Sequence, residues 1–234
     1  MLFKNLRKFH NDIKKLVLNQ FVTKETILLD LACGSGGDLG KWKNNKLIKK
    51  VIGFDIDRKS IKEANRRKKK LNIKNVSFYL KDLSETILYF KKSVDIISIQ
   101  FAFHYFFKTQ ESLNTILMSM KNASKSGTIV LISILNGSLI KNIDTEDLKL
   151  KIFDRSNKAY YGNEISVFIK YSVLNVPTIE YRVNPEFLLF KMNEYGFNLK
   201  NVFNFKEFYN ESYELSELEK KYSFMNEMYI FEKN

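Results

Sequence analysis

The stretch TILLDLACGSGGD, residues 26–38, decides the fold of this 234-residue chain. It begins as an apolar run of strand length and ends in a turn that contains Gly34, Gly36 and Gly37. A buried strand that leads through a Gly-rich turn into a helix is typical of the first unit of a doubly wound α/β fold. The chain lacks both the G-x-G-x-x-G spacing of dinucleotide folds and a P-loop sequence, so this turn is not expected to bind phosphate.

Beyond this turn, apolar runs of strand length alternate with helical patterns. The expected strands are 26–34, 50–57, 76–82, 94–101 and 127–135, and the expected helices are 38–45, 58–72 and 109–122. Strands that alternate with helices predict right-handed crossovers and a parallel sheet.

The alternation changes between about residues 145 and 183. Here EISVFIKYSV (164–173) and TIEYRV (178–183) are typical of antiparallel strands, which predicts an insertion after the fifth strand. The pattern of residues 184–196 then restores a helix, with Pro185 near its first turn.

The C-terminal part adds two more strands, 197–205 and 223–231, on either side of an acidic helix, and they would form a hairpin at the sheet's edge. We therefore predict one domain over residues 1–234, with an N-terminal helical segment at 1–22. Its core would be a doubly wound, mostly parallel seven-strand sheet in an α/β arrangement.

Length and composition limit the class of protein. A chain of this length suits one core, and its single cysteine, Cys33, excludes an internal disulfide. No apolar run is long enough to span a membrane, and the N-terminus does not resemble a signal peptide, so an intracellular protein is expected. The net charge of +13 favours a polyanionic partner. The alternative is a bias toward Lys and Asn, with the charge spread over solvated faces.

Polar side chains end successive strands, which is where ligands bind in open parallel sheets. Asp55 ends the second strand, and such a carboxylate can accept both hydroxyls of a ribose. Asp82 and Gln100 end the third and fourth strands, where Asp82 could meet an adenine amino group. Asp57 is the better cap for the helix that follows, which leaves Asp55 free. Carboxylates in these places suit a neutral nucleoside that carries a positive centre.

Three short motifs are narrower than these general features: QFAFHYFF (100–107), YGNEI (161–165) and KEFY (206–209). With DLACGSGGDL (30–39) and GFDID (53–57), they occur in an order and context that resemble the eukaryotic and viral mRNA cap guanine-N7 methyltransferases. The resemblance spans nearly the whole chain. It implies a Rossmann-like class I methyltransferase fold, the cofactor S-adenosylmethionine with product S-adenosylhomocysteine, and methyl transfer to N7 of the cap guanine of 5′-capped RNA.

The resemblance also implies roles for individual residues. Those expected to bind the cofactor are Lys14, Ala32, Gly34, Asp38, Asp55, Asp82, Gln100 and Tyr105. Those expected to bind the cap are His10, Asn11, Lys41, Arg67, Phe101, His104, Glu164 and Tyr229. Phe101 and Tyr229 would lie beside the guanine, and His104 and Glu164 would bond to its edge. A carboxylate suits that edge because guanine presents N1–H and N2–H₂ donors there, and an adenine would leave the acceptor unpaired.

The sequence departs from the family pattern at four positions that bear on the site. Ala32 stands where the family usually has Gly, Ser35 where it has Lys, Leu135 where it has Pro, and His10 where it has Asn. These changes would affect affinity for the cap more than affinity for the cofactor.

The same resemblance implies additional domains or subunits and a cellular compartment. The family's domain normally carries residues before this Met1, so we expect a domain of a larger capping polypeptide, or one that acts with a stimulatory subunit. It would work in the cytoplasm if viral and in the nucleus if cellular.

The resemblance implies a reaction that depends on positioning. Guanine N7 carries a free lone pair, so no base has to remove a proton, and neither a catalytic acid–base pair nor a metal is expected; Phe101, His104, Tyr105 and Glu164 would position the reactants. Two alternatives remain: a methyltransferase for another RNA or a small molecule, and a non-catalytic RNA-binding capping subunit. The basic run 66–70 is a nuclear localisation signal, an RNA track or, by default, a solvated helix face.

Overall fold

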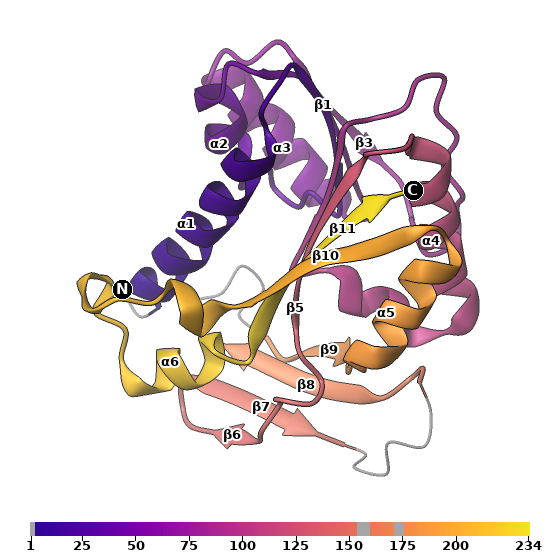
Figure 1. The fold of residues 1–234 in the computed structure, drawn as a ribbon. Coiled ribbons are helices and arrows are strands. Elements are labelled where there is room, and N and C mark those ends of the chain that lie inside the picture. The colour runs from indigo at the N-terminus through magenta and orange to yellow at the C-terminus, as the bar shows by residue number, and fades with distance from the viewer. Residues whose placement is uncertain (1–2, 154–159, 171–175) are drawn as a thin grey trace.

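Two β-sheets form the protein (Figure 1). The computed structural model describes residues 3–153, 160–170 and 176–234. The larger sheet has seven strands in the order β10-β11-β5-β4-β1-β2-β3. Its strands are β1 (Thr26–Leu31), β2 (Ile48–Asp55), β3 (Val76–Leu80), β4 (Ile96–Gln100), β5 (Ile129–Leu135), β10 (Phe197–Asn204) and β11 (Asn226–Lys233). The first five of these pair in parallel, while β11 runs antiparallel to both β5 and β10. The predicted seven-strand, mostly parallel sheet is confirmed.

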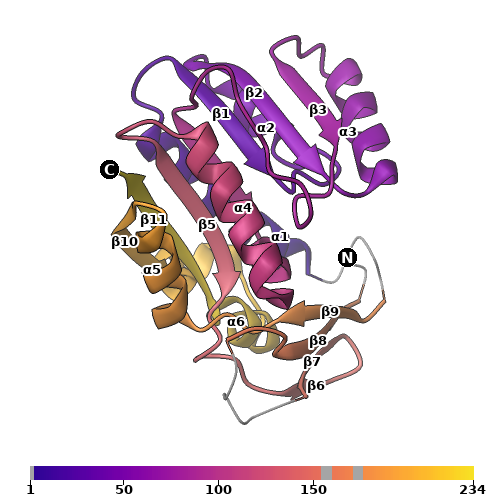
Figure 2. The same cartoon turned by 90° about the vertical axis from the view of Figure 1, so that its right-hand side faces the viewer.

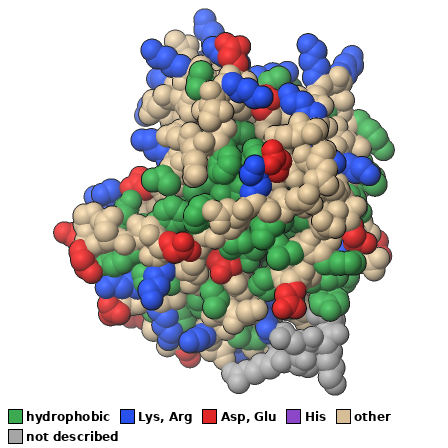
Figure 3. All heavy atoms as spheres, in the orientation of Figure 1, with side chains coloured by type: hydrophobic (Ala, Val, Ile, Leu, Met, Phe, Trp, Pro, Cys, Tyr) green, Lys and Arg blue, Asp and Glu red, His purple; other side chains and the backbone are tan. Residues whose placement is uncertain are grey.

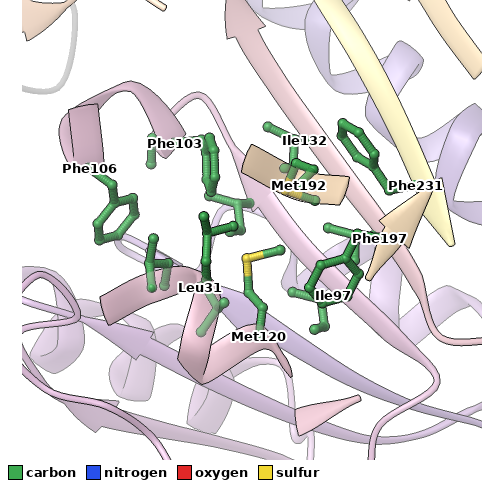
Figure 4. Close-up of a cluster of buried hydrophobic side chains, with 14 of the residues drawn as sticks. Leu31, Ile97, Phe103, Phe106, Met120, Ile132, Met192, Phe197 and Phe231 are labelled. Atoms are coloured by element: carbon green, nitrogen blue, oxygen red, sulfur yellow. The ribbon is translucent and has the colours of Figure 1, made fainter. Parts of the chain in front are cut away.

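Helices cover both faces of this sheet (Figures 1 and 2). One face carries α4 (Gln110–Ala123), α5 (Pro185–Glu194) and the short helix η1 (Phe103–Lys108), and the other carries α1 (Lys4–Phe21), α2 (Leu39–Asn44) and α3 (Arg58–Lys70). Figure 4 shows part of the first layer, where Met120 and Met192 from the two helices pack against strand residues such as Ile97 and Ile132. The strands are buried on both faces, which is why they are continuous apolar runs in the sequence.

The N-terminal helix α1 is amphipathic. Its buried residues Leu6, Phe9, Ile13 and Val17 recur every three or four positions and form one stripe against the sheet. Polar residues of the same helix that lie beside this stripe, including His10 and Lys14, are thereby directed toward the ends of the strands. The helical segment predicted at 1–22 matches α1.

The insertion folds as a separate four-stranded antiparallel sheet in the order β6-β7-β8-β9. Its strands are β6 (Ile143–Asp144), β7 (Leu148–Ile152), β8 (Glu164–Ile169) and β9 (Thr178–Tyr181). The predicted insertion is confirmed, although the sequence interpretation assigned only the last two strands. Residues 171–173, the end of the longer predicted strand, lie outside the described residues. The alternation in LKLKI (148–152) matches the alternating burial of β7 and is the signal that was missed.

Two short helices, η2 (Phe205–Phe208) and η3 (Glu211–Tyr213), and the helix α6 (Glu217–Ser223) connect β10 to β11. A capping box formed by Ser216 and Glu219 starts α6. Glu219 also accepts a hydrogen bond from the backbone N–H of Leu6, so α6 is fastened to α1. No helix in the described part of the chain is long and apolar enough to cross a membrane.

Candidate active site

A cleft of about 590 Å³ lies at the carboxyl ends of the central strands. The strand order reverses between β1 and β4, and open α/β sheets bind ligands beside such a switch point. Four residues expected to bind the cofactor line the cleft: Ala32, Asp55, Asp82 and Tyr105. The opposite wall includes Ile179 and Tyr181 of β9, so the inserted sheet helps to enclose the site.

The turn after β1 has a backbone that suits close approach by a ligand. Ala32 and Gly34 have φ angles of 67° and 51°, in the left-handed region. A Cβ atom built on Gly34 would meet no heavy atom within 4 Å, so its Cα faces open space. Gly36, with φ of 70°, has the opposite surroundings, because a Cβ there would come within 2.9 Å of the Leu39 side chain. Gly36 is therefore required for packing, and Gly34 leaves room for a ligand.

The left-handed conformation of Ala32 predicts a stability effect. A non-glycine residue in this region is strained by about 1–2 kcal/mol, and glycine's extra freedom in the unfolded chain offsets part of the relief. We expect Ala32→Gly to raise the free energy of unfolding by about 0.5–1 kcal/mol, measured by urea titration. Ala102→Gly is the control: Ala102 has φ of −140°, so it should lower stability. A loss of stability in both variants would contradict the strain assigned to Ala32.

Asp55 and Asp57 have separate tasks. Asp57 is the N-cap of α3, where its side chain accepts from the N–H groups of Lys59 and Ser60. Asp55 accepts from the N–H of Gly34 at 2.7 Å and from the N–H of Asp57 at 2.9 Å. Each carboxylate oxygen can accept more than one hydrogen bond, so Asp55 retains acceptor capacity toward the cleft. Asp82 accepts from both the N–H and the hydroxyl of Ser84, and so the loop after β3 fixes its orientation.

A second polar cluster lies between α1 and the start of α2. The ammonium group of Lys14 lies 2.9 Å from an Asp38 oxygen, and Lys41 donates to both Asp38 and Asn11. Burial alone would raise the pKa of Asp38, but Lys14 and Lys41 outweigh it and hold that pKa below its usual value. Gln100 lies beside this cluster, and its Oε1 is buried without a hydrogen-bond partner among the described residues.

A third carboxylate, Asp30, is buried near the two just described, and the sequence interpretation gave it no role. It lies near the end of β1 and is 4% exposed. Burial raises its pKa well above the ordinary value, the nearby Asp38 and Asp55 raise it further, and Lys14 opposes them. The raised pKa favours the protonated, neutral form of Asp30, so the negative charge of the site rests on the neighbouring carboxylates rather than on Asp30.

Aromatic rings meet where α1 crosses the end of β4. His10 stacks on Phe101 with centroids 5.1 Å apart and an interplanar angle of 15°, and Phe205 meets both rings edge-on. A hydrogen bond of 2.8 Å joins His10 Nε2 to the Ser223 hydroxyl. Phe101 itself has φ of 56°, in the left-handed region of the backbone. His10, a departure from the family pattern, therefore covers one side of Phe101.

His10 should make stability sensitive to acid. Burial, with a smaller contribution from Lys14, lowers the pKa of His10 from 6.5 to about 3. In the unfolded chain His10 has its ordinary pKa and binds a proton once the pH falls below it, whereas in the folded protein the buried ring stays neutral. The free energy of unfolding therefore decreases as the pH falls from the ordinary pKa toward the lowered one. We expect the free energy of unfolding to fall more between pH 7 and about 4.5 in the wild type than in His10→Asn. Parallel pH dependences in urea titrations would contradict this.

His104 and Glu180 form a buried polar pair behind Tyr105, a residue that lines the cleft. His104 is 5% exposed, and its Nε2 lies 3.5 Å from Glu180 Oε2. Neither ring nitrogen of His104 has a hydrogen-bond partner among the described residues. Burial lowers the pKa of His104, and Glu180 opposes this only in part, so the ring is neutral at pH 7. Tyr105 packs against the His104 ring with centroids 4.2 Å apart.

The cap roles expected of three further residues stay predictions. Tyr229 is 2% exposed in the core, stacks on Phe231, and its hydroxyl donates to Glu227. Glu164 is exposed at the start of β8 and does not line the cleft. Arg67 points from α3 into solvent and is paired with Glu63 at 2.8 Å.

Hydrophobic side chains gather in the middle of the face that carries α1 and α6, and charged side chains of both signs stand mostly around its margin, with Lys and Arg prominent along the upper edge (Figure 3). No group of three or more His, Cys, Asp or Glu side chains in residues 3–153, 160–170 and 176–234 could hold a metal ion.

This architecture is shared with a large class of enzymes. The S-adenosylmethionine-dependent methyltransferase of Clostridium acetobutylicum matches it with a TM-score of 0.63 and 16% identity, over 100% of this chain and 93% of that protein. The chain thus has the fold of class I S-adenosylmethionine-dependent methyltransferases.

The sequence places it more narrowly within that class. A family model, the mRNA (guanine-N(7))-methyltransferase domain, matches residues 2–232, and the chain belongs to this family. The mRNA cap guanine-N(7) methyltransferase of Eremothecium gossypii is 27% identical over 88% of this chain and 54% of its own length. That of Schizosaccharomyces pombe is 26% identical over 84% of this chain and 60% of its own length. The chain thus spans a little over half the length of these relatives.

Proposed function

We propose that this chain transfers a methyl group from S-adenosylmethionine to N7 of the guanine in the 5′ cap of mRNA. The observation that carries the proposal is the family match over residues 2–232. Two features of the structure also support the proposal: the cleft at the strand ends and the buried pair of His104 and Glu180 beside it.

The residues of the cleft fit the nucleoside half of the cofactor. Asp55 would accept the ribose hydroxyls with its remaining lone pairs, and Asp82 would accept from the adenine amino group. Ala32 and Gly34 would border the ligand with backbone, since Gly34 faces open space. The cleft volume of about 590 Å³ is in the range of small-molecule sites.

The second cluster fits the methionine half. Lys14 and Asp38 are ion-paired with one another in this structure, and a zwitterionic amino acid would offer each of them an opposite charge. Lys14 would bind the carboxylate and Asp38 the ammonium group, while the unpartnered oxygen of Gln100 offers the ammonium a further acceptor. Lys41 is held by Asp38 and Asn11, so it would reach a cap phosphate only after leaving these partners.

For the guanine edge we propose Glu180 in place of Glu164. Glu180 has a side chain only 13% exposed beside the unpartnered ring of His104, whereas Glu164 is exposed. A desolvated carboxylate can accept from N1–H and N2–H₂ together, and adenine offers no such pair of donors. Phe101 and Tyr105 would border the base with aromatic faces, which stack bases at about 1–3 kcal/mol each.

The main task of the protein in this reaction is to align the two reactants. When bound, the cofactor supplies a methyl group already activated by the positive sulfonium. Since guanine N7 has a free lone pair, the residues of the cleft need only hold the base in line with the methyl carbon and exclude water. The negative charge of Glu180 would also favour the positive charge that develops on the methylated guanine.

We further propose capped RNA as the macromolecular partner and the cell interior as the place of action. The net charge of +13 supports binding to a polyanion. We also propose that further capping domains or a stimulatory subunit act with this chain, which is shorter than the relatives it matches.

A competition assay tests the choice of base. Transfer of labelled methyl to capped RNA should be inhibited by unlabelled GpppG and left unchanged by the same concentration of ApppA. Equal inhibition by both would point to recognition of the phosphates alone and would overturn the proposed guanine specificity.

A further inference from the structure

A second hollow lies at the end of the large sheet opposite the cleft. It has a volume of about 500 Å³ and forms where β2 and β3 begin, between the end of α2 and the turn after α3. In Figure 1, α2 and α3 lie away from the inserted sheet, and Lys and Arg side chains are prominent along the upper edge of Figure 3. We call this hollow the lysine groove, because the described residues that line it include three asparagines, no Asp or Glu, and Lys43, Lys46, Lys49 and Lys74.

The positive charge of the lysine groove is mostly unpaired. Lys43, Lys46 and Lys74 are exposed, and none of them has an ion-pair partner among the described residues. Lys49 is paired with Glu25 at 3.1 Å, but the Glu25 side chain is 75% exposed, and such a surface pair contributes little to stability. Lys43 lies in the last turn of α2, where a positive charge offsets the helix dipole. The other three lysines lie outside helices, so this effect does not explain their presence.

Hydrogen bonds hold the walls of the groove together. Asn75 donates from its side chain to the carbonyl of Ile48 at 2.8 Å, which joins the start of β3 to the start of β2. Asn45 accepts from the backbone N–H of Leu47 and donates to the side chain of Asn19 in α1. The lysines are therefore carried by a backbone whose spacing is fixed, and only their side chains have to be ordered when an anion binds.

Helix α3 leads from the cleft to the lysine groove. Ile56, two residues before α3, lines the cleft, and Asn72, two residues after it, lines the groove. The 13 residues of the helix, RKSIKEANRRKKK, include eight Lys or Arg and one acid, Glu63, which pairs with Arg66 and Arg67. At about 1.5 Å per residue the helix spans about 20 Å, and a stacked strand with about 3.4 Å per phosphate covers this length in roughly six nucleotides.

Resting on the proposed function, we propose that the lysine groove binds the phosphate backbone of the RNA body while the cap occupies the cleft. Unpaired lysines suit a phosphate chain, which gains affinity by releasing the counterions condensed on it. A hollow admits a narrow chain more readily than a flat bilayer surface, so RNA is favoured over an anionic membrane. Capped RNA should therefore bind more tightly once it is longer than roughly ten nucleotides.

The test compares capped RNAs of about three and about twenty nucleotides, of which only the longer can reach the groove. Lys46→Gln/Lys74→Gln removes two exposed, unpaired charges from the groove. At about 0.1 M salt each lost phosphate contact costs about fivefold in affinity, so Kd and KM for the longer RNA should rise about tenfold or more. The slope of log Kd against log salt should fall by about 1.4, while both constants for the shorter RNA stay unchanged.

Lys121→Gln/Lys141→Gln is the matched control, because it removes the same charge from exposed positions on α4 and before β6. It should bind both RNAs as the wild type does, and an equal loss in the two double variants would show an effect of net charge alone and overturn the groove. Equal affinity for S-adenosylhomocysteine in all three proteins shows that they are folded.

The remaining outcomes separate this proposal from the proposed function. If Lys46→Gln/Lys74→Gln binds the longer RNA normally, the groove is overturned while methylation of the cap stands. The same holds if this variant loses only its binding to vesicles that contain phosphatidylserine. If it loses affinity for the longer RNA but the wild type methylates no cap, the groove stands and the proposed function is overturned.

Discussion

Replacing Glu180 with glutamine is expected to lower kcat/KM for methyl transfer to GpppA-capped RNA by about a hundred- to a thousandfold. The carboxylate would lose its charge, and the new amide would point an N–H₂ donor at the donors of guanine. Two hydrogen bonds to a charged acceptor contribute about 1.5–3 kcal/mol each, and the smaller value for both corresponds to about a hundredfold loss. The amide oxygen of glutamine can still accept one hydrogen bond, which limits the expected loss to about a thousandfold. Affinity for S-adenosylhomocysteine, measured by calorimetry, should stay within about twofold of the wild type.

Glu164→Gln is the matched control for this experiment. It makes the same chemical change on the neighbouring strand, at an exposed position. Its kcat/KM should equal that of the wild type. A large loss in Glu164→Gln together with normal activity in Glu180→Gln would restore the assignment expected from the sequence and contradict the one based on burial.

The second large effect concerns the cofactor. Asp55→Ala should weaken binding of S-adenosylhomocysteine by about a hundredfold, because two charge-assisted hydrogen bonds to the ribose disappear. The turn should also loosen, since Asp55 accepts from the N–H of Gly34. Calorimetric titration of the folded variant measures this effect without requiring any RNA substrate.

Asp57→Ala, two residues away, separates cofactor binding from helix capping. It removes the N-cap of α3, which should cost about 1 kcal/mol of stability and leave affinity within about twofold. If Asp57→Ala weakens binding as much as Asp55→Ala does, the loss reflects disorder at the start of α3, and the ribose contact of Asp55 is refuted.

Much of the fold was predictable because its signals are local. The five parallel strands are buried on both faces and appear as apolar runs, and the seven-strand sheet with an antiparallel insertion is confirmed. The separate tasks of Asp55 and Asp57 could also be inferred, because a cap must immediately precede its helix. The number of strands in the insertion was underestimated, since β6 is only two residues long and Lys interrupts β7.

The cap side of the site was harder to predict because it depends on how distant segments pack. Tyr229 is an aromatic residue in the last strand, but β11 is covered on both sides, and the ring enters the core. Glu164 and Glu180 lie on adjacent strands, and their sequence context does not say which of them becomes buried.

One measurement tests the central claim directly. GpppA-capped RNA is incubated with the protein and S-adenosylmethionine labelled on its methyl group, and the RNA is then digested with nuclease to release the cap. The proposal predicts that the label is recovered as N7-methylguanosine from the cap. Label at any other base or at a ribose, or no label in RNA from a protein that binds S-adenosylhomocysteine, would contradict it.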